Sequence, residues 1–498
     1  MKGCIVLQNQ YAKFGHAIAL ELKKKHGVSK FCAYIFSPGA KEFIQSQDDI
    51  KYDPVLVDHE LHENYKKEDI DLEYIRRFED EYSEPHLWSY LYTDRKLMMS
   101  IGPKEETTAE IDPMHDHETL LLIFQVRAKS IEKMLKESKP DFIIFFAIGT
   151  LGHLIIYHVA KKLGIKTYNV DYPRIGSQVC ISENYNTLTG VIKKFEQLKN
   201  EGDSKLKEEA IEFIDNYKKT GSLQLEYHEL NKKIQPKLHN LFKIKNIIRS
   251  IKYLKILYSN YSKNKIFFTY GETDQNPLLF ILYQLKRKYR GIKGISKLCS
   301  KPNYNEDYVF FPLHYEPELA LLLLSPFYFD QIALIRQIAR SLPLHYKLYV
   351  NEHPSMKNKR PISFYKELTK IPNVKLIGFG TKSHEIVKNA KLVTTITGTL
   401  GWEACLLGKP VITFGEVFFN NLSSVIRIKN IENLPTIVKQ QLNEFVYDKK
   451  EMIKFVEAVL DDSFEFKHFK LWYEDFEKVK NDQGIKDFAA LVYQKLQE

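Results

Sequence analysis

The sequence has few cysteines and no long hydrophobic run. No apolar stretch reaches the roughly eighteen residues that a transmembrane helix requires, so no membrane span is predicted. The first residues, MKGCIVLQNQ, are typical of a first strand rather than of a secretory signal. The five cysteines are far apart and show no CxxC or Cys/His spacing, so we interpret them as buried, reduced thiols of a cytoplasmic protein. They are Cys4, Cys32, Cys180, Cys299 and Cys405.

Acidic residues are scarce in one part of this chain, whose net charge is +10. Between Lys232 and Lys301, lysine and arginine recur while Glu272 and Asp274 are the only acids. Such a segment attracts phospholipid headgroups, a lipid diphosphate or a nucleotide, or it is simply a solvated helical face. No nucleic-acid-binding motif accompanies the charge, so DNA and RNA are not expected partners. We expect peripheral attachment to an anionic membrane surface, on the inner face of the cytoplasmic membrane.

The pattern of hydrophobic segments predicts an α/β protein with two Rossmann-like domains. With 498 residues, the chain exceeds the size at which a single core keeps growing. A first strand–helix series runs from GCIVLQ to IKTYNVDY and a second from YVFFPLH to PVITFG, and each predicts a parallel sheet covered by helices. The predicted units are an N-terminal domain at 1–200 with an insertion at 40–115, a helical basic connector at 201–303, a C-terminal domain at 304–430, and helices at 431–498.

A polar, glycine-containing turn separates the predicted strand LVTTIT from the predicted helix LGWEACLLG. In an open parallel sheet, ligands bind outside the carboxyl ends of the strands, where this turn lies. The unpaired amides and the dipole of a helix N-terminus favour an anion, so we expect Thr397, Gly398 and Thr399 to bind a phosphate. Glu403, in the first turns of the helix, is expected to accept hydrogen bonds from ribose hydroxyls. The alternative is an ordinary capped helix.

Two further strands of the second series end in polar residues. YKLYV runs into Asn351, Glu352, His353 and Pro354, and the histidine is a suitable donor to a phosphate oxygen. Pro354 fixes the turn that presents this histidine. The domain's first strand, YVFFP, is followed by His314 and Glu318, which we expect to face the nucleotide and the cleft between the domains. A purely structural turn remains the alternative for this last segment.

These segments together carry a resemblance to a known family. FPLHYEPE, DQIALIRQIARSLP, LYVNEHP, NVKLI and TTITGTLGWEACLLGKPVITFG occur in the order seen in the capsule polysaccharide biosynthesis family, whose best-understood relatives transfer Kdo from CMP-Kdo. The resemblance covers about a quarter of the chain. It implies a GT-B architecture, in which two Rossmann-like domains face a cleft, and it matches His353, Pro354, the Thr397–Thr399 loop and Glu403 to donor-binding motifs. Asn351 stands where many relatives have lysine, which leaves the donor sugar open.

The N-terminal domain is expected to supply the acceptor side. Asp171 or His16 is a candidate general base toward an acceptor hydroxyl, and Arg174 is a candidate for contacting a carboxylate or phosphate. For each of these three residues, a purely structural role is the alternative. His115-Asp116-His117 lacks a third ligand in view, so no metal site is predicted there.

The leading hypothesis is a metal-independent glycosyltransferase that uses a nucleotide sugar, CMP- or UDP-linked, and a glycan or lipid-linked acceptor, with no further cofactor. The helix terminus and His353 would stabilise the leaving phosphate, and domain closure would exclude water. The sequence leaves two alternatives open. One is a sugar-nucleotide epimerase, and the other is a non-catalytic capsule assembly or export factor that binds a lipid-linked glycan.

Overall fold

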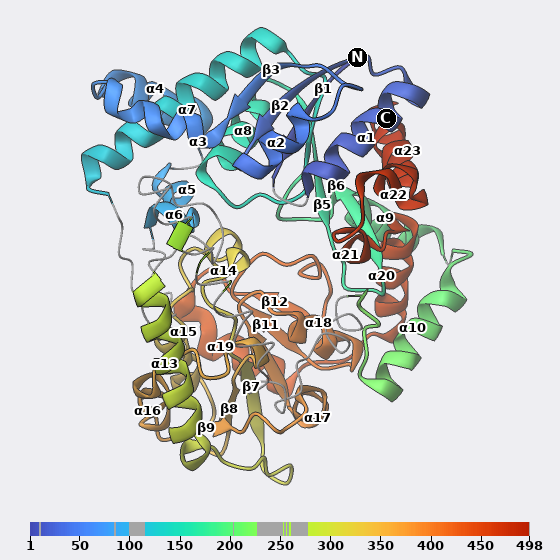
Figure 1. The fold of residues 1–498 in the computed structure, drawn as a ribbon. Coiled ribbons are helices and arrows are strands. Elements are labelled where there is room, and N and C mark those ends of the chain that lie inside the picture. Colours follow the sequence, from blue (N-terminus) through green and yellow to red (C-terminus); the bar gives the residue numbers. More distant parts are fainter. Residues whose placement is uncertain are drawn as a thin grey trace.

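The protein has two α/β lobes, each built around one mainly parallel sheet (Figure 1). The computed structural model describes residues 1–8, 11–83, 86–98, 115–202, 204–226, 252, 255, 258–259 and 277–497. The middle of the predicted basic connector, from residue 227 to residue 276 apart from 252, 255 and 258–259, lies outside these ranges, as do residues 99–114 of the predicted insertion. The prediction of two Rossmann-like domains is confirmed.

The first sheet has the strand order β13-β6-β5-β4-β1-β2-β3. Strands β1 to β5 are parallel, and β6 and β13 are added in antiparallel fashion at one edge. Successive side chains of β1 point to opposite faces, so Ile5 and Leu7 enter one core and Cys4 and Val6 the other. The strands are β1 (Lys2–Leu7), β2 (Lys30–Ile35), β3 (Tyr52–Val57), β4 (Phe142–Phe145), β5 (Lys166–Asp171), β6 (Gln178–Ser182) and β13 (Ser463–Glu465).

Helices cover both faces of this sheet. Most of them come from the N-terminal part of the chain. They are α1 (Tyr11–His26), α2 (Pro38–Gln45), α3 (Asp58–Glu63), the 3-10 turn η1 (Asn64–Lys67), α4 (Leu72–Tyr82), α5 (Trp88–Thr93), α6 (Arg95–Met98), α7 (His117–Ser138) and α8 (Leu151–Lys162).

The second sheet is wholly parallel and has the order β12-β11-β10-β7-β8-β9. Read from β9, this is the doubly wound arrangement in which the direction of strand addition reverses between β7 and β10. The strands are β7 (Tyr308–Pro312), β8 (Lys347–Asn351), β9 (Val374–Ile377), β10 (Leu392–Thr395), β11 (Val411–Thr413) and β12 (Val425–Arg427). The helices and turns between them are α14 (Leu319–Leu324), α15 (Gln331–Arg340), η5 (Pro354–Met356), α16 (Ile362–Thr369), α17 (Ser383–Asn389) and α18 (Thr399–Leu406).

The C-terminal residues return to the first lobe instead of forming a unit of their own. Strand β13 pairs with β6, and α23 packs on α1, so the two chain ends lie near each other (Figure 1). The predicted unit 431–498 is therefore divided: Leu434 and Val438 pack in the core of the second sheet, whereas the residues from β13 onward complete the N-terminal domain. Its helices are η6 (Ile431–Asn433), α19 (Leu434–Asn443), α20 (Lys449–Asp461), α21 (His468–Leu471), α22 (Phe476–Asn481) and α23 (Gln483–Gln497).

The first part of the segment 40–115 is not the insertion that the sequence had predicted. It contains β3, which is the edge strand of the first sheet, so this part belongs to the domain core. The connector contributes η4 (Ser296–Leu298) and three described helices, of which the first begins before residue 201. These helices are α9 (Thr189–Glu201), α10 (Lys207–Thr220) and α13 (Pro277–Lys293). Helices α9 and α10 pack on α20, and one hydrophobic core runs from them into the second lobe.

Candidate functional site

Three strands of the second sheet end side by side at one edge, and their loops carry the candidate donor-binding residues. Strand β7 lies between β10 and β8, and Pro312 at the end of β7 is opposite Asn351 at the end of β8. The loops that follow β7, β8 and β10 hold His314, His353 and Thr397 respectively. Because the reversal of strand order falls between β7 and β10, this edge is the expected ligand position of a doubly wound sheet.

His314 ties the loop after β7 to the loop after β10. Its Nε2 accepts the Thr397 backbone N–H at 3.2 Å and lies 3.2 Å from Thr395 Oγ1. Burial lowers the pKa of His314 to about 3, helped by the nearby His353 and Arg360, so the ring is neutral. A neutral ring that accepts at Nε2 carries its proton on Nδ1. This buried Nδ1–H has no hydrogen-bond partner among the described residues.

The loop before α18 is already partly hydrogen-bonded within the protein. Thr397 donates its backbone N–H to His314, and Gly398 donates to Thr395 Oγ1 at 3.0 Å. Gly398 is the N-cap residue, and no side chain caps the helix. The backbone amides of Thr397 and Gly398 are therefore not available to an anion. The groups expected to bind it are the first amides of α18, starting at Thr399, and the Thr397 hydroxyl. That hydroxyl is buried and has no partner within the described part of the chain.

His353 presents the opposite hydrogen-bonding arrangement from His314. Its Nδ1 accepts the Ser355 backbone N–H at 3.2 Å, at the start of the turn that Pro354 opens. Burial lowers its pKa, and the positive charges of Arg360 and Lys359 lower it further. The ring is therefore neutral near pH 7 and carries its proton on Nε2, which makes it a donor.

A buried ion-pair network lies beneath these loops. Arg360 is 1% exposed and sits 3.3 Å from a carboxylate oxygen of Glu316 and 3.3 Å from one of Glu352. It also donates to the backbone carbonyl of His314. Glu352 accepts from the His353 backbone N–H at 2.7 Å and from the Tyr365 hydroxyl at 2.7 Å. Burial raises the pKa of Glu352, while Arg360 opposes that rise.

This network gives Glu352 a supporting role in place of the predicted ligand contact, and it adds Arg360 to the residues of the site. Glu352 is 2% exposed and is held by protein groups, so it supports the backbone of His353 rather than facing a ligand. Arg360 was missed by the sequence analysis because it stands in the polar run KNKRP, where nothing distinguishes a buried cation from a solvated one. Supporting contacts of this kind fix the orientation of groups that bind ligands.

Glu403 is also in a specific hydrogen bond. Tyr217 of α10 is fully buried and donates its hydroxyl to Glu403 Oε2 at 2.7 Å. The same hydroxyl lies 3.2 Å from Nδ1 of His384 on α17, so it accepts from that nitrogen. Burial raises the pKa of Glu403 to about 7, and the bond from Tyr217 opposes that rise. Three elements thus hold this carboxylate, and none of the described hydrogen bonds occupies its Oε1.

The two lobes are in contact near Glu318 of the second lobe and Arg95 of the first. Glu318 precedes α14, and burial raises its pKa, while the positive charges of Arg174 and Arg95 oppose that rise. Arg95 donates to the Pro317 carbonyl at 3.0 Å, which joins the two lobes directly. Arg174 has a φ of 61°, a left-handed conformation that is uncommon for a long side chain.

Asp171 precedes Arg174 by three residues in the chain. It ends β5, accepts the Tyr172 backbone N–H at 2.7 Å, and has a pKa that burial raises and Arg174 lowers. The positive charge of Arg174 thus opposes the raised pKa of a carboxyl group in each lobe. These three residues are within electrostatic reach of one another, and none of the described hydrogen bonds or ion pairs joins them.

His16 does not belong to this group. It is fully buried on α1, where its Nδ1 is 2.9 Å from the Tyr52 hydroxyl and its ring packs near Phe43 and Phe476. Burial lowers its pKa to about 4. A side chain with no exposed surface cannot reach an acceptor, so His16 is a core residue and is dropped as a candidate base.

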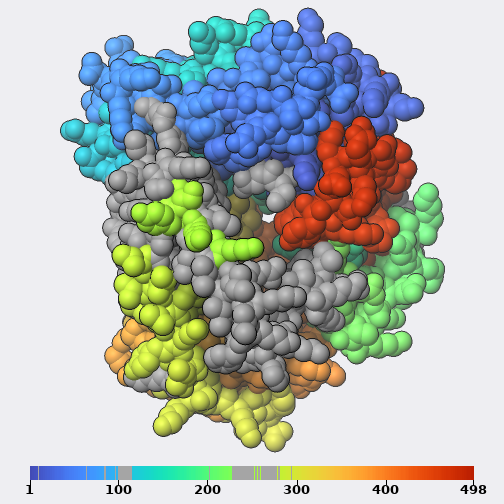
Figure 2. All heavy atoms as spheres, viewed as in Figure 1, coloured from blue at the N-terminus to red at the C-terminus, as the bar shows by residue number. Residues whose placement is uncertain are grey.

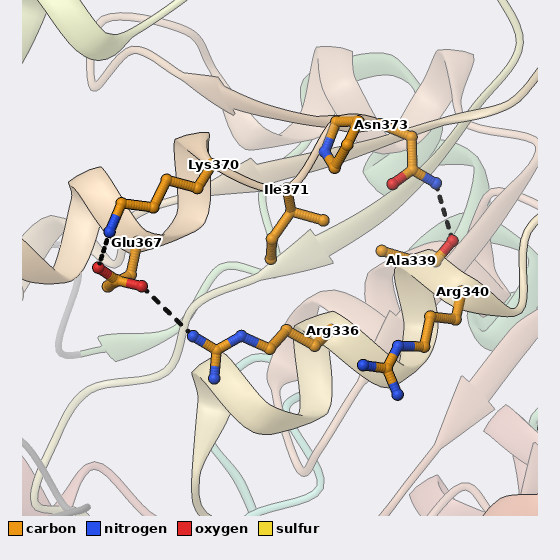
Figure 3. Close-up of a pocket in the computed structure, with 8 residues that line it drawn as sticks. Arg336, Ala339, Arg340, Glu367, Lys370, Ile371 and Asn373 are labelled. Atoms are coloured by element: carbon orange, nitrogen blue, oxygen red, sulfur yellow. Dashed lines mark hydrogen bonds and ion pairs between the residues drawn. The ribbon is translucent and has the colours of Figure 1, made fainter.

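A separate surface pocket of about 370 Å³ lies at the opposite edge of the second sheet (Figure 3). Its walls come from the ends of α15 and α16, where Glu367 bonds to Lys370 at 2.5 Å and pairs with Arg336 at 3.4 Å. Asn373 immediately precedes β9, so this is the amino-terminal edge of the strands. Ligands of such sheets bind at the carboxyl edge, so this pocket is not the candidate site.

Within the described ranges, no group of three or more His, Cys, Asp or Glu side chains is arranged to hold a metal ion.

Comparison with known proteins agrees with the resemblance seen in the sequence. Residues 231–423 match the model of the family described as capsule polysaccharide biosynthesis protein, and this range includes all the candidate donor-binding residues. The resemblance to this family is thus confirmed over that part of the chain. A curated relative, Protein FixF of Sinorhizobium fredii, is 30% identical over 122 residues. This match spans 24% of the chain and 29% of the length of FixF.

The solved structures that match this chain are distant from it in sequence and in structure. Thermosulfurimonas dismutans KpsC, a beta Kdo 2,7 transferase, is 12% identical with a TM-score of 0.33, over 67% of this chain and 80% of that one. UDP-GlcNAc 2-epimerase from Methanocaldococcus jannaschii is 15% identical with a TM-score of 0.24, over 93% of this chain and 99% of the other. The two-sheet architecture therefore rests on the strand order of this chain itself.

Proposed function

We propose that the protein is a glycosyltransferase of surface polysaccharide biosynthesis, which moves a sugar from a nucleotide-sugar donor to a glycan or lipid-linked acceptor. The observation that carries the proposal is the convergence of His353, the uncapped start of α18 and Glu403 at the carboxyl edge of the second sheet. The match of residues 231–423 to the capsule polysaccharide biosynthesis family supports the same conclusion.

The donor half of the mechanism follows from the hydrogen-bond donors at this edge. The diphosphate or monophosphate of the donor would lie against the first amides of α18, where the helix dipole favours an anion. His353 would donate from Nε2 to a phosphate oxygen, since its Nδ1 is occupied by Ser355. Both contacts strengthen as negative charge builds on the leaving phosphate, so they lower the barrier. The Oε1 atom of Glu403 would accept from a ribose hydroxyl while Tyr217 holds Oε2.

The acceptor half would use Asp171 and Arg174 of the first lobe and Glu318 of the second. Asp171 has a pKa raised by burial, which suits a general base that must take a proton from an acceptor hydroxyl. Arg174 would contact an anionic group of the acceptor, and Glu318 would keep this arginine directed toward the second lobe. The proton of the acceptor hydroxyl passes to Asp171 as the new glycosidic bond forms and the nucleotide leaves.

Turnover experiments distinguish this proposal from its alternatives. The wild-type protein is incubated with a nucleotide sugar, with and without an acceptor glycan, and the released nucleotide is measured. We expect release only with acceptor, and we expect Asp171→Asn to lower kcat by about a hundredfold or more with little change in donor binding. Interconversion of nucleotide sugars without acceptor would indicate an epimerase. Binding of glycan without any release of nucleotide would indicate a non-catalytic assembly factor.

A further inference from the structure

Helix α13 carries a row of large apolar side chains on the protein surface. Leu282 is 54% exposed, Leu285 55% and Ile292 87%. With 3.6 residues per turn, these positions fall on one stripe of the helix, within an arc of about 100°. Three more exposed apolar side chains share the stripe: Leu278, Ile281 and Tyr289. Scattered apolar residues are normal on a protein surface, but a continuous row of this length is typical of an interaction face.

The other side of α13 attaches the helix to the second lobe. Tyr283 and Arg290 are each 8% exposed, and Arg290 donates to the backbone carbonyl of Lys359. A Cβ atom at Gly291 would come within 3.0 Å of Asn358, so the helix backbone lies close to that loop. Helix α13 runs along the outside of this lobe (Figures 1 and 2). Leu282, Leu285 and Ile292 are therefore not part of the side through which the described contacts attach the helix.

The charge on α13 has one sign. Its sequence, PLLFILYQLKRKYRGIK, contains no acidic residue. Lys286 and Lys288 are exposed and lie on opposite flanks of the apolar row, each about 80° from its centre. A helix with an apolar stripe bordered by cations is the pattern of segments that lie in the plane of a membrane interface. Cations at this position attract anionic lipid headgroups.

We propose that α13 is a membrane-binding helix, which lies on an anionic bilayer with its apolar row among the upper acyl chains and its lysines at headgroup phosphates. Its 17 residues span about 25 Å, and their charges exclude a crossing of the bilayer. A second copy of the chain fits this face poorly, because pairing would bring Lys286 and Lys288 of two copies together. In the described ranges, no helix combines the length and hydropathy of a membrane span.

Attachment through α13 would place the candidate site next to the membrane. Arg290 contacts Lys359, and the following residue is Arg360, the buried cation beneath the His314 and His353 loops. A lipid-linked acceptor would then be presented near the site that receives it. This last step depends on the proposed function, whereas the binding of α13 to a bilayer does not.

Vesicle sedimentation tests the proposal with the full chain. We expect the wild-type protein to pellet with vesicles of phosphatidylcholine mixed with phosphatidylglycerol, and much less with phosphatidylcholine alone. The double variant Leu282→Gln/Leu285→Gln should bind these vesicles at least about tenfold more weakly. In contrast, Leu344→Gln, at a fully exposed leucine before β8, should bind like the wild type.

The two flanking lysines are tested separately. Lys286→Gln and Lys288→Gln should each lower the affinity for anionic vesicles by about fivefold at low salt. Lys449→Gln/Lys450→Gln, at exposed lysines of α20, is the matched control.

All these substitutions are at exposed positions, so we expect them to leave the unfolding temperature unchanged. Measuring this temperature verifies that each variant is folded. The proposal is wrong if the wild type stays in the supernatant with anionic vesicles, or if the leucine double variant pellets as well as the wild type. It is also wrong if the wild type forms a dimer in solution that the leucine variant abolishes, because the row would then be a subunit interface. Nucleotide-sugar binding in solution should be the same for all variants, which separates this test from that of the proposed function.

Discussion

His314 and His353 are both neutral, yet their hydrogen bonds give them different tasks. His314 accepts at Nε2 from the loop before α18, so it holds that loop in place. His353 accepts at Nδ1 from Ser355, so its Nε2–H is left to donate. In both cases burial, with Arg360 nearby, lowers the pKa. Burial is the main reason that both imidazoles are uncharged beside an expected phosphate, and the charge of Arg360 adds to it in each case.

The raised pKa of Glu403 predicts a pH-dependent cost to folding. Its pKa rises from 4.5 to about 7, so between these values the folded state keeps a proton that the unfolded state has lost. The free energy of unfolding must then fall as the pH rises through this window. The shift corresponds to at most about 3 kcal/mol. We expect Glu403→Gln to be more stable than the wild type above pH 7, and the difference to vanish below pH 4.5.

Urea denaturation across this pH range measures the effect. Glu432→Gln, at an exposed position in η6, should change the free energy of unfolding by less than about 0.5 kcal/mol at every pH. A Glu403→Gln difference that is the same at all pH values would show that this carboxylate titrates normally.

At the scale of elements, the turn before α18 depends on a residue without a side chain. A Cβ atom on Gly398 would lie 2.7 Å from Thr395 Oγ1 and 3.0 Å from His314 Nε2. Its φ of −74° suits any residue, so the conflict is one of space alone. We expect Gly398→Ala to displace His314, to destabilise the protein by about 1–3 kcal/mol, and to weaken nucleotide binding.

Gly380→Ala is the matched control, since nothing lies within 4 Å of its added Cβ. Calorimetric unfolding and nucleotide titration of both variants make the comparison. Equal behaviour of the two variants would contradict the tight contact between the turn and His314.

The sequence predicted which strands end at the candidate site. It did not predict the edge strand β3 or the buried polar residues that hold the site's side chains in position. Strong apolar runs such as YVFFP and LVTTIT are buried on both faces of a parallel sheet, so their ends are easy to place. Strand β3 was hidden because it is an edge strand whose sequence, YDPVLV, contains a charge and a proline. Arg360 and Tyr217 were missed because burial of a polar side chain depends on partners far away in the chain.

At the scale of the whole molecule, the C-terminal segment is an integral part of the first lobe. The C-terminal residues add β13 to its sheet and helices α22 and α23 to its core. Phe488 of α23 is fully buried in that core. The single core that joins α9, α10 and α20 to the second sheet makes the two lobes depend on the same helices.

Phe488→Ala should therefore destabilise the N-terminal lobe although it lies near the other end of the chain. We expect a loss of about 3–5 kcal/mol, seen as earlier loss of hydrogen-exchange protection in β1 and β4. Tyr473→Ala, at an 80% exposed position, should change little. If Phe488→Ala leaves protection in β1 and β4 unchanged, the C-terminal segment does not complete this lobe.

The central claim is that a nucleotide sugar binds at the carboxyl edge of the second sheet, between His353 and the start of α18. The most direct test is thermal stabilisation by a panel of CMP- and UDP-sugars, measured for the wild type, His353→Ala, Glu403→Gln and Arg340→Ala. Arg340 is an exposed cation in the pocket at the opposite edge. We predict that at least one nucleotide sugar stabilises the wild type and Arg340→Ala by about 2.7 kcal/mol at a hundred times its Kd, and stabilises the other two variants far less. The claim is contradicted if no nucleotide sugar stabilises the wild type, or if His353→Ala and Glu403→Gln respond as the wild type does.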